Sequence, residues 1–224
     1  MPFSIAVDGP AGAGKSTIAK RIAQMKDLIY IDTGAMYRAC ALKALRMGIS
    51  CSDPASVDGM IKDTVIAFSG SDPANRRIYL DGEDVTDLIR SPEVSIGASD
   101  ISALASVRAS MVSLQRSMAA GSNVILDGRD IGTYVLPDAD LKVFLTASAE
   151  ERARRRLSEV RAKGDLQITY EEVLKDIEYR DRNDSQRELA PLKKAEDAVE
   201  IDPTGSRIDQ VVASVSALMD ERCL

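Results

Sequence analysis

One run of the sequence combines glycines with a lysine and two hydroxyl side chains, a set of residues suited to holding phosphate groups. The run, here called the phosphate loop, consists of Gly9, Pro10, Ala11, Gly12, Ala13, Gly14, Lys15, Ser16 and Thr17. It fits the pattern GxxxxGK[ST] and lies between an apolar, strand-like run and a helical pattern at residues 18–23. In such a loop backbone N–H groups converge on phosphate oxygens, Lys15 reaches the β- and γ-phosphates, and the Ser16 hydroxyl ligates Mg²⁺. We therefore predict a nucleoside triphosphate site; the alternative is a flexible turn with an exposed lysine.

A second polar cluster, Asp127-Gly128-Arg129-Asp130, directly follows an apolar run. Gly128 would let the backbone turn sharply, Arg129 can fork onto a phosphate, and Asp130 can accept a hydrogen bond from an exocyclic amine or a ribose hydroxyl. These residues would serve a second, anion-reading site. A turn closed by an internal ion pair is an equally good interpretation of the same four residues.

The segment at residues 32–38, Asp-Thr-Gly-Ala-Met-Tyr-Arg, repeats this arrangement after another apolar run. Thr33 is well placed to cap the helix that follows, and Arg38 lies beyond the first turn. We expect an anion to bind at this helix start. The alternative is a plain cap, with Arg38 on a solvated face.

Arginines gather on two predicted helices in the last third of the chain. Arg152, Arg155 and Arg156 share one helical face, whereas Arg154 points elsewhere. After Gly164 a second helix carries a polar stripe with the spacing i, i+4, i+7, made of Arg180, Asp184 and Arg187. Two arginine-bearing helices at about residues 150–190 suit a lid that closes over phosphates. In isolation, such a stripe is more often a solvated face.

Five short apolar runs, at residues 4–7, 28–31, 123–126, 141–145 and 198–201, alternate with helical patterns. Near-continuous apolar strands between helices are typical of a parallel sheet covered on both faces. Four of the runs are followed at once by an aspartate: Asp8, Asp32, Asp127 and Asp202. Ligands of such folds bind at the carboxyl ends of the strands, so we expect these acids to surround the site.

The stretch at residues 63–92 interrupts the α/β rhythm. Residues 64–68 and 77–85 have strand-like composition, and the Asp81-Gly82 pair inside the second run predicts a hairpin. We therefore expect a small β-rich subdomain inserted into a core formed by residues 1–62 and 93–224. Helical patterns follow at about 93–120, 149–162, 169–185 and 206–221.

Composition excludes several function classes. The 224 residues contain no histidine, which removes Ser-His-Asp triads and imidazole metal sites. Lys and Arg number 29 against 35 Asp and Glu, a net charge of −6, so nucleic acid is not an expected partner. Three cysteines without CxxC spacing indicate reduced thiols. No apolar run is long enough for a membrane span, and the first residues do not resemble a signal peptide. We expect a cytoplasmic protein without membrane partners.

A phosphate loop does not by itself name a reaction. GTPases require an Asn-Lys-x-Asp base reader, but none of Asn75, Asn123 and Asn183 is followed by lysine. The LSGGQ signature of transporter ATPases is also absent. A small kinase with a second, arginine-lined site is the interpretation that remains.

Taken together, the motifs resemble those of the bacterial cytidylate kinases, nucleoside monophosphate kinases of the P-loop fold. Beside the phosphate loop, the matching stretches are DTGAMYR at 32–38, LDGEDVT at 80–86, DGRDIGT at 127–133 and the segment from Arg180 to Leu192. The resemblance covers residues 5 to about 205. It implies a P-loop three-layer α/β fold with a five-stranded parallel sheet, a helical lid and a small antiparallel insertion on the acceptor side.

The resemblance also implies roles for individual residues. ATP would lie on residues 9–17 and CMP on the facing side. Positions that match those around the cytosine are Thr33, Ser99, Arg108 and Asp130; Arg38 and Arg129 match phosphate readers, Arg180 and Asp184 match ribose contacts, and Arg187 matches a further phosphate contact. Arg155 matches a lid arginine near the transferred group. With Lys15, the residues Arg129, Arg155 and Arg187 would form the catalytic set.

The reaction implied is phosphoryl transfer from ATP, bound with Mg²⁺, to CMP or dCMP, by a protein that we expect to be a monomer. Two alternatives stay open at this point. One is a small-metabolite kinase that uses the same loop with another acceptor, and the other is a module that binds ATP without catalysis. The DGRD cluster and the β insertion count against the first, and four acceptor-side arginines count against the second.

Overall fold

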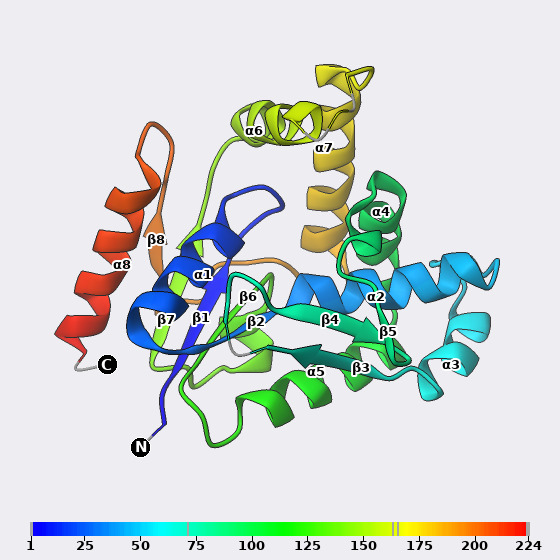
Figure 1. The fold of residues 1–224 in the computed structure, drawn as a ribbon, viewed down its shortest axis with the longest axis horizontal. Helices are drawn as coiled ribbons and strands as arrows, with labels where there is room; N and C mark the ends of the chain where they lie inside the picture. Colours follow the sequence, from blue (N-terminus) through cyan, green and yellow to red (C-terminus); the bar gives the residue numbers. More distant parts are fainter. Residues whose placement is uncertain (1, 71, 163, 165, 223–224) are drawn as a thin grey trace.

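A parallel sheet forms the centre of the molecule. The computed structural model describes residues 2–70, 72–162, 164 and 166–222. Five strands lie in the order β2-β6-β1-β7-β8, and each neighbouring pair is parallel (Figure 1). They are β1 (Ser4–Asp8), β2 (Ile29–Asp32), β6 (Val124–Gly128), β7 (Leu141–Leu145) and β8 (Val199–Ile201). The predicted fold class is therefore confirmed, and each of the five apolar runs contains a strand.

Both faces of the sheet are covered by apolar clusters. Alternate residues of a strand point to opposite faces, so neighbouring residues belong to different clusters. Ile5 and Val7 belong to the apolar cluster shared with α1 (Lys15–Lys26) and α8 (Ile208–Glu221). Ala6, between them, belongs to the cluster on the other face, with α2 (Thr33–Arg46) and α5 (Ala105–Ala119). Burial on both faces explains why the strands are nearly continuous apolar runs.

The interrupting segment forms a separate antiparallel sheet in the order β3-β4-β5. Its strands are β3 (Ile66–Ser69), β4 (Arg77–Leu80) and β5 (Glu83–Asp84), followed by a 3₁₀ turn, η1 (Leu88–Arg90). Asp81 and Gly82 join β4 to β5 with φ values of 50° and 88°, the left-handed pair that a tight type I′ hairpin needs. The predicted hairpin is confirmed. Ile78 and Leu80 pack in the same apolar cluster as α2.

The helical pattern over 93–120 forms two helices rather than one. After α3 (Pro54–Lys62), the chain forms α4 (Pro92–Ile101) and then α5. Leu104 has extended backbone between them, and Arg108 in the first turns of α5 donates to the carbonyl of Ser102 at 3.4 Å. This side-chain contact satisfies a carbonyl that a continuous helix would have bonded internally.

The lid consists of α6 (Ala149–Ala162) and α7 (Tyr170–Gln186), which lie together at one end of the molecule (Figure 1). Ala153, Val173 and Ile177 form a small apolar cluster between the two helices. Thr169 and Glu172 form a reciprocal capping box at the start of α7. Among the described residues, no helix is both long and apolar enough to cross a membrane.

Candidate active site

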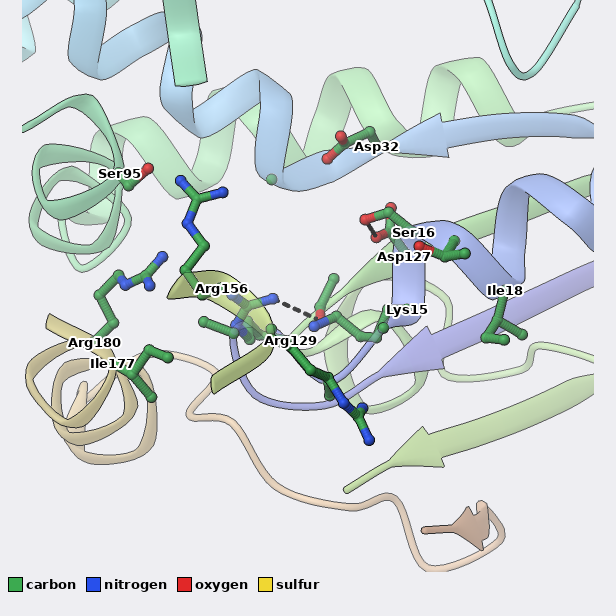
Figure 2. A pocket seen from close by; sticks show the side chains of 18 of the residues that line it. Lys15, Ser16, Ile18, Asp32, Ser95, Asp127, Arg129, Arg156, Ile177 and Arg180 are labelled. Atoms are coloured by element: carbon green, nitrogen blue, oxygen red, sulfur yellow. Dashed lines mark hydrogen bonds between the residues drawn. The ribbon is translucent and has the colours of Figure 1, made fainter. Parts of the chain in front are cut away.

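A cavity of about 850 Å³ lies at the carboxyl end of the parallel sheet, where α/β folds place their ligands. The phosphate loop, the start of α2, one face of α4, the end of β6, both lid helices and the β8–α8 loop line it. Figure 2 shows Arg129, Arg156 and Arg180 on the side of this cavity opposite Ile18. The predicted phosphate loop and the predicted arginine helices therefore face one space.

The phosphate loop begins at a position that only glycine can occupy. Gly9 has φ 146°, and a Cβ atom there would lie 2.1 Å from the carbonyl oxygen of Leu145. Residues 11–17 line the cavity, whereas the carbonyls of Gly9 and Pro10 lie behind it and each accept a hydrogen bond from Lys15 Nζ at 2.8 Å. Gly14, the residue before α1, has left-handed backbone and no side-chain cap, which leaves the first N–H groups of the helix open to an anion.

The lysine side chain is held in an environment that disfavours its charge. Lys15 is buried, and burial together with the nearby Arg129 guanidinium lowers its pKa, against the opposing effect of Asp127. A phosphate group in the cavity would favour the charged form instead. The loop is therefore arranged for an anion whose negative charge favours the charged form of Lys15.

Strand alternation separates the strand-end aspartates. Asp32 and Asp127 line the cavity, as expected. Asp8 points to the other face of the sheet, where its carboxylate accepts from the N–H groups of Ile131 and Gly132 at 2.8 Å each. Burial raises the pKa of Asp8 to about 6 despite these two bonds. Asp202 accepts from its own loop at Thr204. The expectation that all four acids surround the site is therefore wrong for Asp8 and Asp202.

Asp127 and Ser16 form an oxygen pair at the start of α1. Ser16 Oγ donates to Asp127 Oδ2 at 2.6 Å, one of the contacts dashed in Figure 2. Burial, followed by the negative charge of Asp32, raises the pKa of Asp127. Hydroxyl and carboxylate oxygens are the ligands that hard divalent cations prefer, so this pair fits a cation that arrives with phosphates. Elsewhere in the described chain, no group of three or more acidic or cysteine side chains forms a metal centre.

A positive cluster faces the phosphate loop across the cavity. Arg129 is at the end of β6 and donates through Nε to Asp184 at 2.8 Å. Arg180 on α7 is partly buried. Burial, then the positive charges of Arg129 and Arg156, lowers its pKa to about 10. Arg155 and Arg156 of α6 also line the cavity, whereas the side chain of Arg154 is 67% exposed. The predicted division of this arginine run between two helix faces is confirmed.

Asp130 lies in a buried ion-pair cluster. Its carboxylate accepts from Arg108 at one oxygen and from Arg187 Nη2 at the other, the latter at 2.8 Å. Both guanidinium groups are only 3% exposed. Arg187 also donates to Ser102 Oγ at 3.2 Å. Asp130 and Arg187 line the cavity, whereas Arg108 lies behind Asp130, outside the cavity wall. The postulated ion pair inside the DGRD turn is replaced by long-range pairs to α5 and to the end of α7.

Thr33 and Gly128 differ from their predicted roles. The cap of α2 is Asp32, whose carboxylate accepts from the N–H of Ala35, while Thr33 is the first helical residue and donates to the carbonyl of Asp127 at 2.7 Å. Gly128 ends β6 instead of turning the chain. Glycine is needed there for space, since a Cβ would lie 2.7 Å from the Thr33 hydroxyl.

The remaining predicted acceptor residues are brought to the same space. Thr33, Arg38, Ser99 and Asp184 all line the cavity. Arg38 pairs with Asp32 at 3.1 Å, and Ser99 Oγ lies 3.4 Å from Asp184 Oδ1. Apart from Gly9, Pro10 and Arg108, every residue that the sequence assigned to the two sites lines the cavity.

Several neighbours of the site carried no clear sequence signal. Arg152 was placed only as part of an arginine face, yet it is buried and donates to the carbonyl of Ala11 at 2.9 Å and to Asp181 at 2.5 Å. It therefore joins the lid to the phosphate loop. Other cavity residues without a predicted role include Lys20, Tyr37, Arg90, Ser95 and the β8–α8 loop. The charge stripe on α6 placed Arg152 on an arginine face of the predicted lid, but it gave no signal for its contact with Ala11.

Comparison with known proteins identifies the family. The family model named "Cytidylate kinase" matches residues 5–221. A cytidylate kinase of Desulfitobacterium hafniense (strain Y51) is 51% identical over 220 residues, which cover 98% of this chain and 94% of that protein. Another, from Caldicellulosiruptor bescii, is 50% identical over 216 residues, or 96% of this chain and 95% of that protein. The chain belongs to the cytidylate kinase family.

Membership of the cytidylate kinase family confirms the prediction of a nucleoside monophosphate kinase with CMP as its acceptor. It does not favour the small-metabolite kinase or the non-catalytic ATP-binding module. A crystal structure titled as an uncharacterized protein from Eubacterium ventriosum ATCC 27560 has a TM-score of 0.53 over 99% of both chains. At 10% identity that likeness shows a shared fold alone.

Proposed function

We propose that this cytidylate kinase family member transfers the γ-phosphoryl group of ATP to CMP or dCMP, giving ADP and CDP or dCDP. The observation that carries the proposal is the single cavity in which the phosphate loop faces Arg129, Arg155 and Arg180. Two negatively charged nucleotides could meet there end to end. A protein that only sensed ATP would need no second set of cations.

On the donor side, residues 11–17 would hold the phosphates of ATP through backbone N–H groups, with Gly9 and Pro10 fixing Lys15 from behind. The β8–α8 loop, which lines the same cavity, is available to the nucleoside of ATP. Ser16 and Asp127 would hold Mg²⁺. When bound, this cation neutralises charge on the β- and γ-phosphate oxygens.

On the acceptor side, Arg38 and Arg129 would bind the CMP phosphate, and Arg180 and Asp184 the ribose. Thr33 and Ser99 would lie near the cytosine, beside Asp130 and, behind it, Arg108. Asp130 uses one lone pair on each oxygen for its two arginines, so each oxygen keeps a lone pair that can accept from the cytosine 4-amino group. Uracil offers a carbonyl at that position and would leave Asp130 facing an acceptor, which costs binding.

Arg187 has fewer N–H groups available for a phosphate than a guanidinium without protein partners would have. Three of its donors already bond Ser102, Asp130 and the carbonyl of Ala190. A guanidinium carries five N–H groups, so two remain for a phosphate oxygen. We propose that Arg187 contributes through these two while it keeps Asp130 in place.

The residues present suit a reaction that needs positioning and charge neutralisation rather than covalent chemistry. Lys15, Arg129, Arg155 and Arg187 supply positive charge around the transferring group. Closure of α6 and α7 would exclude the water that could otherwise accept the phosphoryl group. The absence of histidine is compatible with this chemistry, because phosphoryl transfer here requires no dedicated histidine base.

We further propose that residues 1–62 and 93–224 form the kinase core, with the lid at about 150–190, and that residues 63–92 are an insertion on the acceptor side. The small sheet packs in the same apolar cluster as α2, and α2 begins at the proposed acceptor site. This packing supports an insertion on the acceptor side. We also propose that the enzyme is a cytoplasmic monomer.

The test is ADP formation from ATP with a panel of acceptors: CMP, dCMP, UMP, AMP and gluconate. We expect CMP and dCMP to give the highest kcat/KM. Equal kcat/KM for CMP and UMP would overturn the role of Asp130 in base choice and leave the kinase assignment intact. ADP formation that does not depend on any added monophosphate would overturn the assignment itself.

A further inference from the structure

The two oxygens of the Asp127 carboxylate have different buried partners. Oδ2 accepts from Ser16 at 2.6 Å, and Oδ1 accepts from the Tyr30 hydroxyl at 3.0 Å. The tyrosine is 2% exposed. Its hydroxyl therefore cannot exchange this bond for one to bulk water.

The fold explains why a tyrosine of β2 reaches this carboxylate. Tyr30 pairs in register with Ile125 of β6, and Asp127 lies two residues farther along on the same face. A diagonal neighbour on an adjacent strand is within reach of an aromatic side chain, and the ring extends along the strand to place its hydroxyl at Oδ1. The remaining face of the ring is also in contact, because Lys20 Nζ lies 5.7 Å from its centroid.

A residue of the inserted segment holds the same tyrosine from outside. β2 is an edge strand, so its outward carbonyls have no partner strand. Arg76, just before β4, donates to the carbonyl of Tyr30, and its guanidinium lies 5.1 Å from the Phe68 ring centroid. The inserted segment thus contacts the strand that carries Tyr30.

Apolar packing alone does not require this hydroxyl. Phenylalanine would fill the same space beside Ile125 and Val7, which belong to the same apolar cluster. What the hydroxyl adds is a fixed orientation of the Asp127 carboxylate. One oxygen is held by Tyr30, and the other is thereby directed to Ser16 at the start of α1.

We propose that Tyr30, held by Arg76, is a positioning residue for the divalent cation that accompanies ATP, because it fixes the Asp127 carboxylate in the orientation that presents Oδ2 beside Ser16. This inference rests on the proposed function, since it assigns Asp127 and Ser16 to that cation. Tyr30 itself does not line the cavity.

The experiment measures Mn²⁺ affinity in the presence of ATP, by the electron paramagnetic resonance signal of free Mn²⁺, for wild type, Tyr30→Phe, Asp127→Asn and the double variant. A hydrogen bond to a charged group contributes about 1.5 kcal/mol, so Tyr30→Phe should weaken Mn²⁺ binding about tenfold. ATP affinity without a divalent cation should change less than twofold. In the Asp127→Asn background Tyr30→Phe should add no further loss. Tyr79→Phe, on the small sheet, is the matched control and should bind Mn²⁺ as wild type does.

Wild-type Mn²⁺ affinity in Tyr30→Phe, or an equal loss with and without the Asp127→Asn change, would overturn the proposal. Urea unfolding of each variant shows whether the fold is kept. If Tyr30→Phe does not fold, Arg76→Ala provides the second test: a loss of about threefold supports the proposal and an unchanged affinity overturns it. Unchanged Mn²⁺ binding in Asp127→Asn would overturn this inference but not the kinase assignment, which CMP-dependent ADP formation tests separately.

Discussion

Replacing Asp130 with asparagine tests whether the buried ion-pair cluster holds the acceptor side together. The carboxylate is about as buried as its partners, Arg108 and Arg187, which are each 3% exposed. Asparagine has nearly the same volume but offers a single acceptor oxygen, and its NH₂ group would face a guanidinium donor. Both buried arginines therefore lose their shared counter-charge, and one of them also loses its hydrogen-bond acceptor. Breaking a buried pair in this way costs about 3–5 kcal/mol, a large fraction of the 5–15 kcal/mol that stabilises a typical domain.

The assay is urea unfolding of wild type and Asp130→Asn at pH 7.5, beside Asp209→Asn. Asp209 pairs with Arg21 at 2.9 Å, but their side chains are 62% and 55% exposed, so the control should lose less than about 1 kcal/mol. Folded Asp130→Asn should also discriminate less between CMP and UMP, because its amide can donate to the uracil carbonyl. A loss of stability no larger than that of Asp209→Asn would refute the buried cluster as the source of stability.

Three further predictions concern other charges of the site. Lys15→Ala should lower kcat at least 10²-fold, about 2.7 kcal/mol of transition-state stabilisation, and near-wild-type turnover in steady-state assays would contradict its role. The pKa of Asp8 is raised by burial from 3.8 to about 6, so its contribution to stability is complete below pH 4 and is lost as the pH rises through 6. The unfolding free energy of wild type relative to Asp8→Asn should therefore fall by about 2.4 kcal/mol between pH 4 and pH 7.5, and a flat difference would show that Asp8 does not titrate in this range. Arg180→Gln should raise the melting temperature of the ligand-free protein and reduce the further rise caused by CMP, because burial and neighbouring cations lower the pKa of Arg180 to about 10. A lower melting temperature with an unchanged CMP-induced rise would contradict this account.

Local patterns were sufficient to predict the parallel sheet, the phosphate loop and the Asp81-Gly82 hairpin. Each depends on residues that are close in the chain: apolar runs, glycine spacing and turn residues. The wrong prediction of the cap residue of α2 also concerned residues that are close in the chain. Aspartate and threonine are both good caps, and they are adjacent here, so propensity could not decide between Asp32 and Thr33.

Contacts between distant residues could not be predicted in the same way. Asp130 is paired with residues 22 and 57 positions away, and Tyr30 donates to a residue 97 positions away. Such pairs depend on which strands become neighbours and on which face a side chain lies, and a periodic pattern contains neither fact. Arg152 illustrates the same point, since a charged stripe is normally solvated, yet its partner at Ala11 is 141 positions away. The positions could be assigned to the site from motifs, but their partners could not.

The arrangement of charges explains why the cavity suits a transfer between two nucleotides. Lys15 and Arg180 both have lowered pKa values, and Arg129 contributes to each of these shifts through its positive charge. Crowded cations repel one another, and this repulsion is relieved when negative charge lies between them. A single mononucleotide phosphate on the acceptor side would leave the phosphate loop unsatisfied, and ATP alone would leave Arg38 paired with Asp32 and without an acceptor phosphate. The largest electrostatic gain is therefore expected when both phosphate chains are present, the state in which, in the proposed function, the γ-phosphoryl group would lie between Lys15 and the arginines.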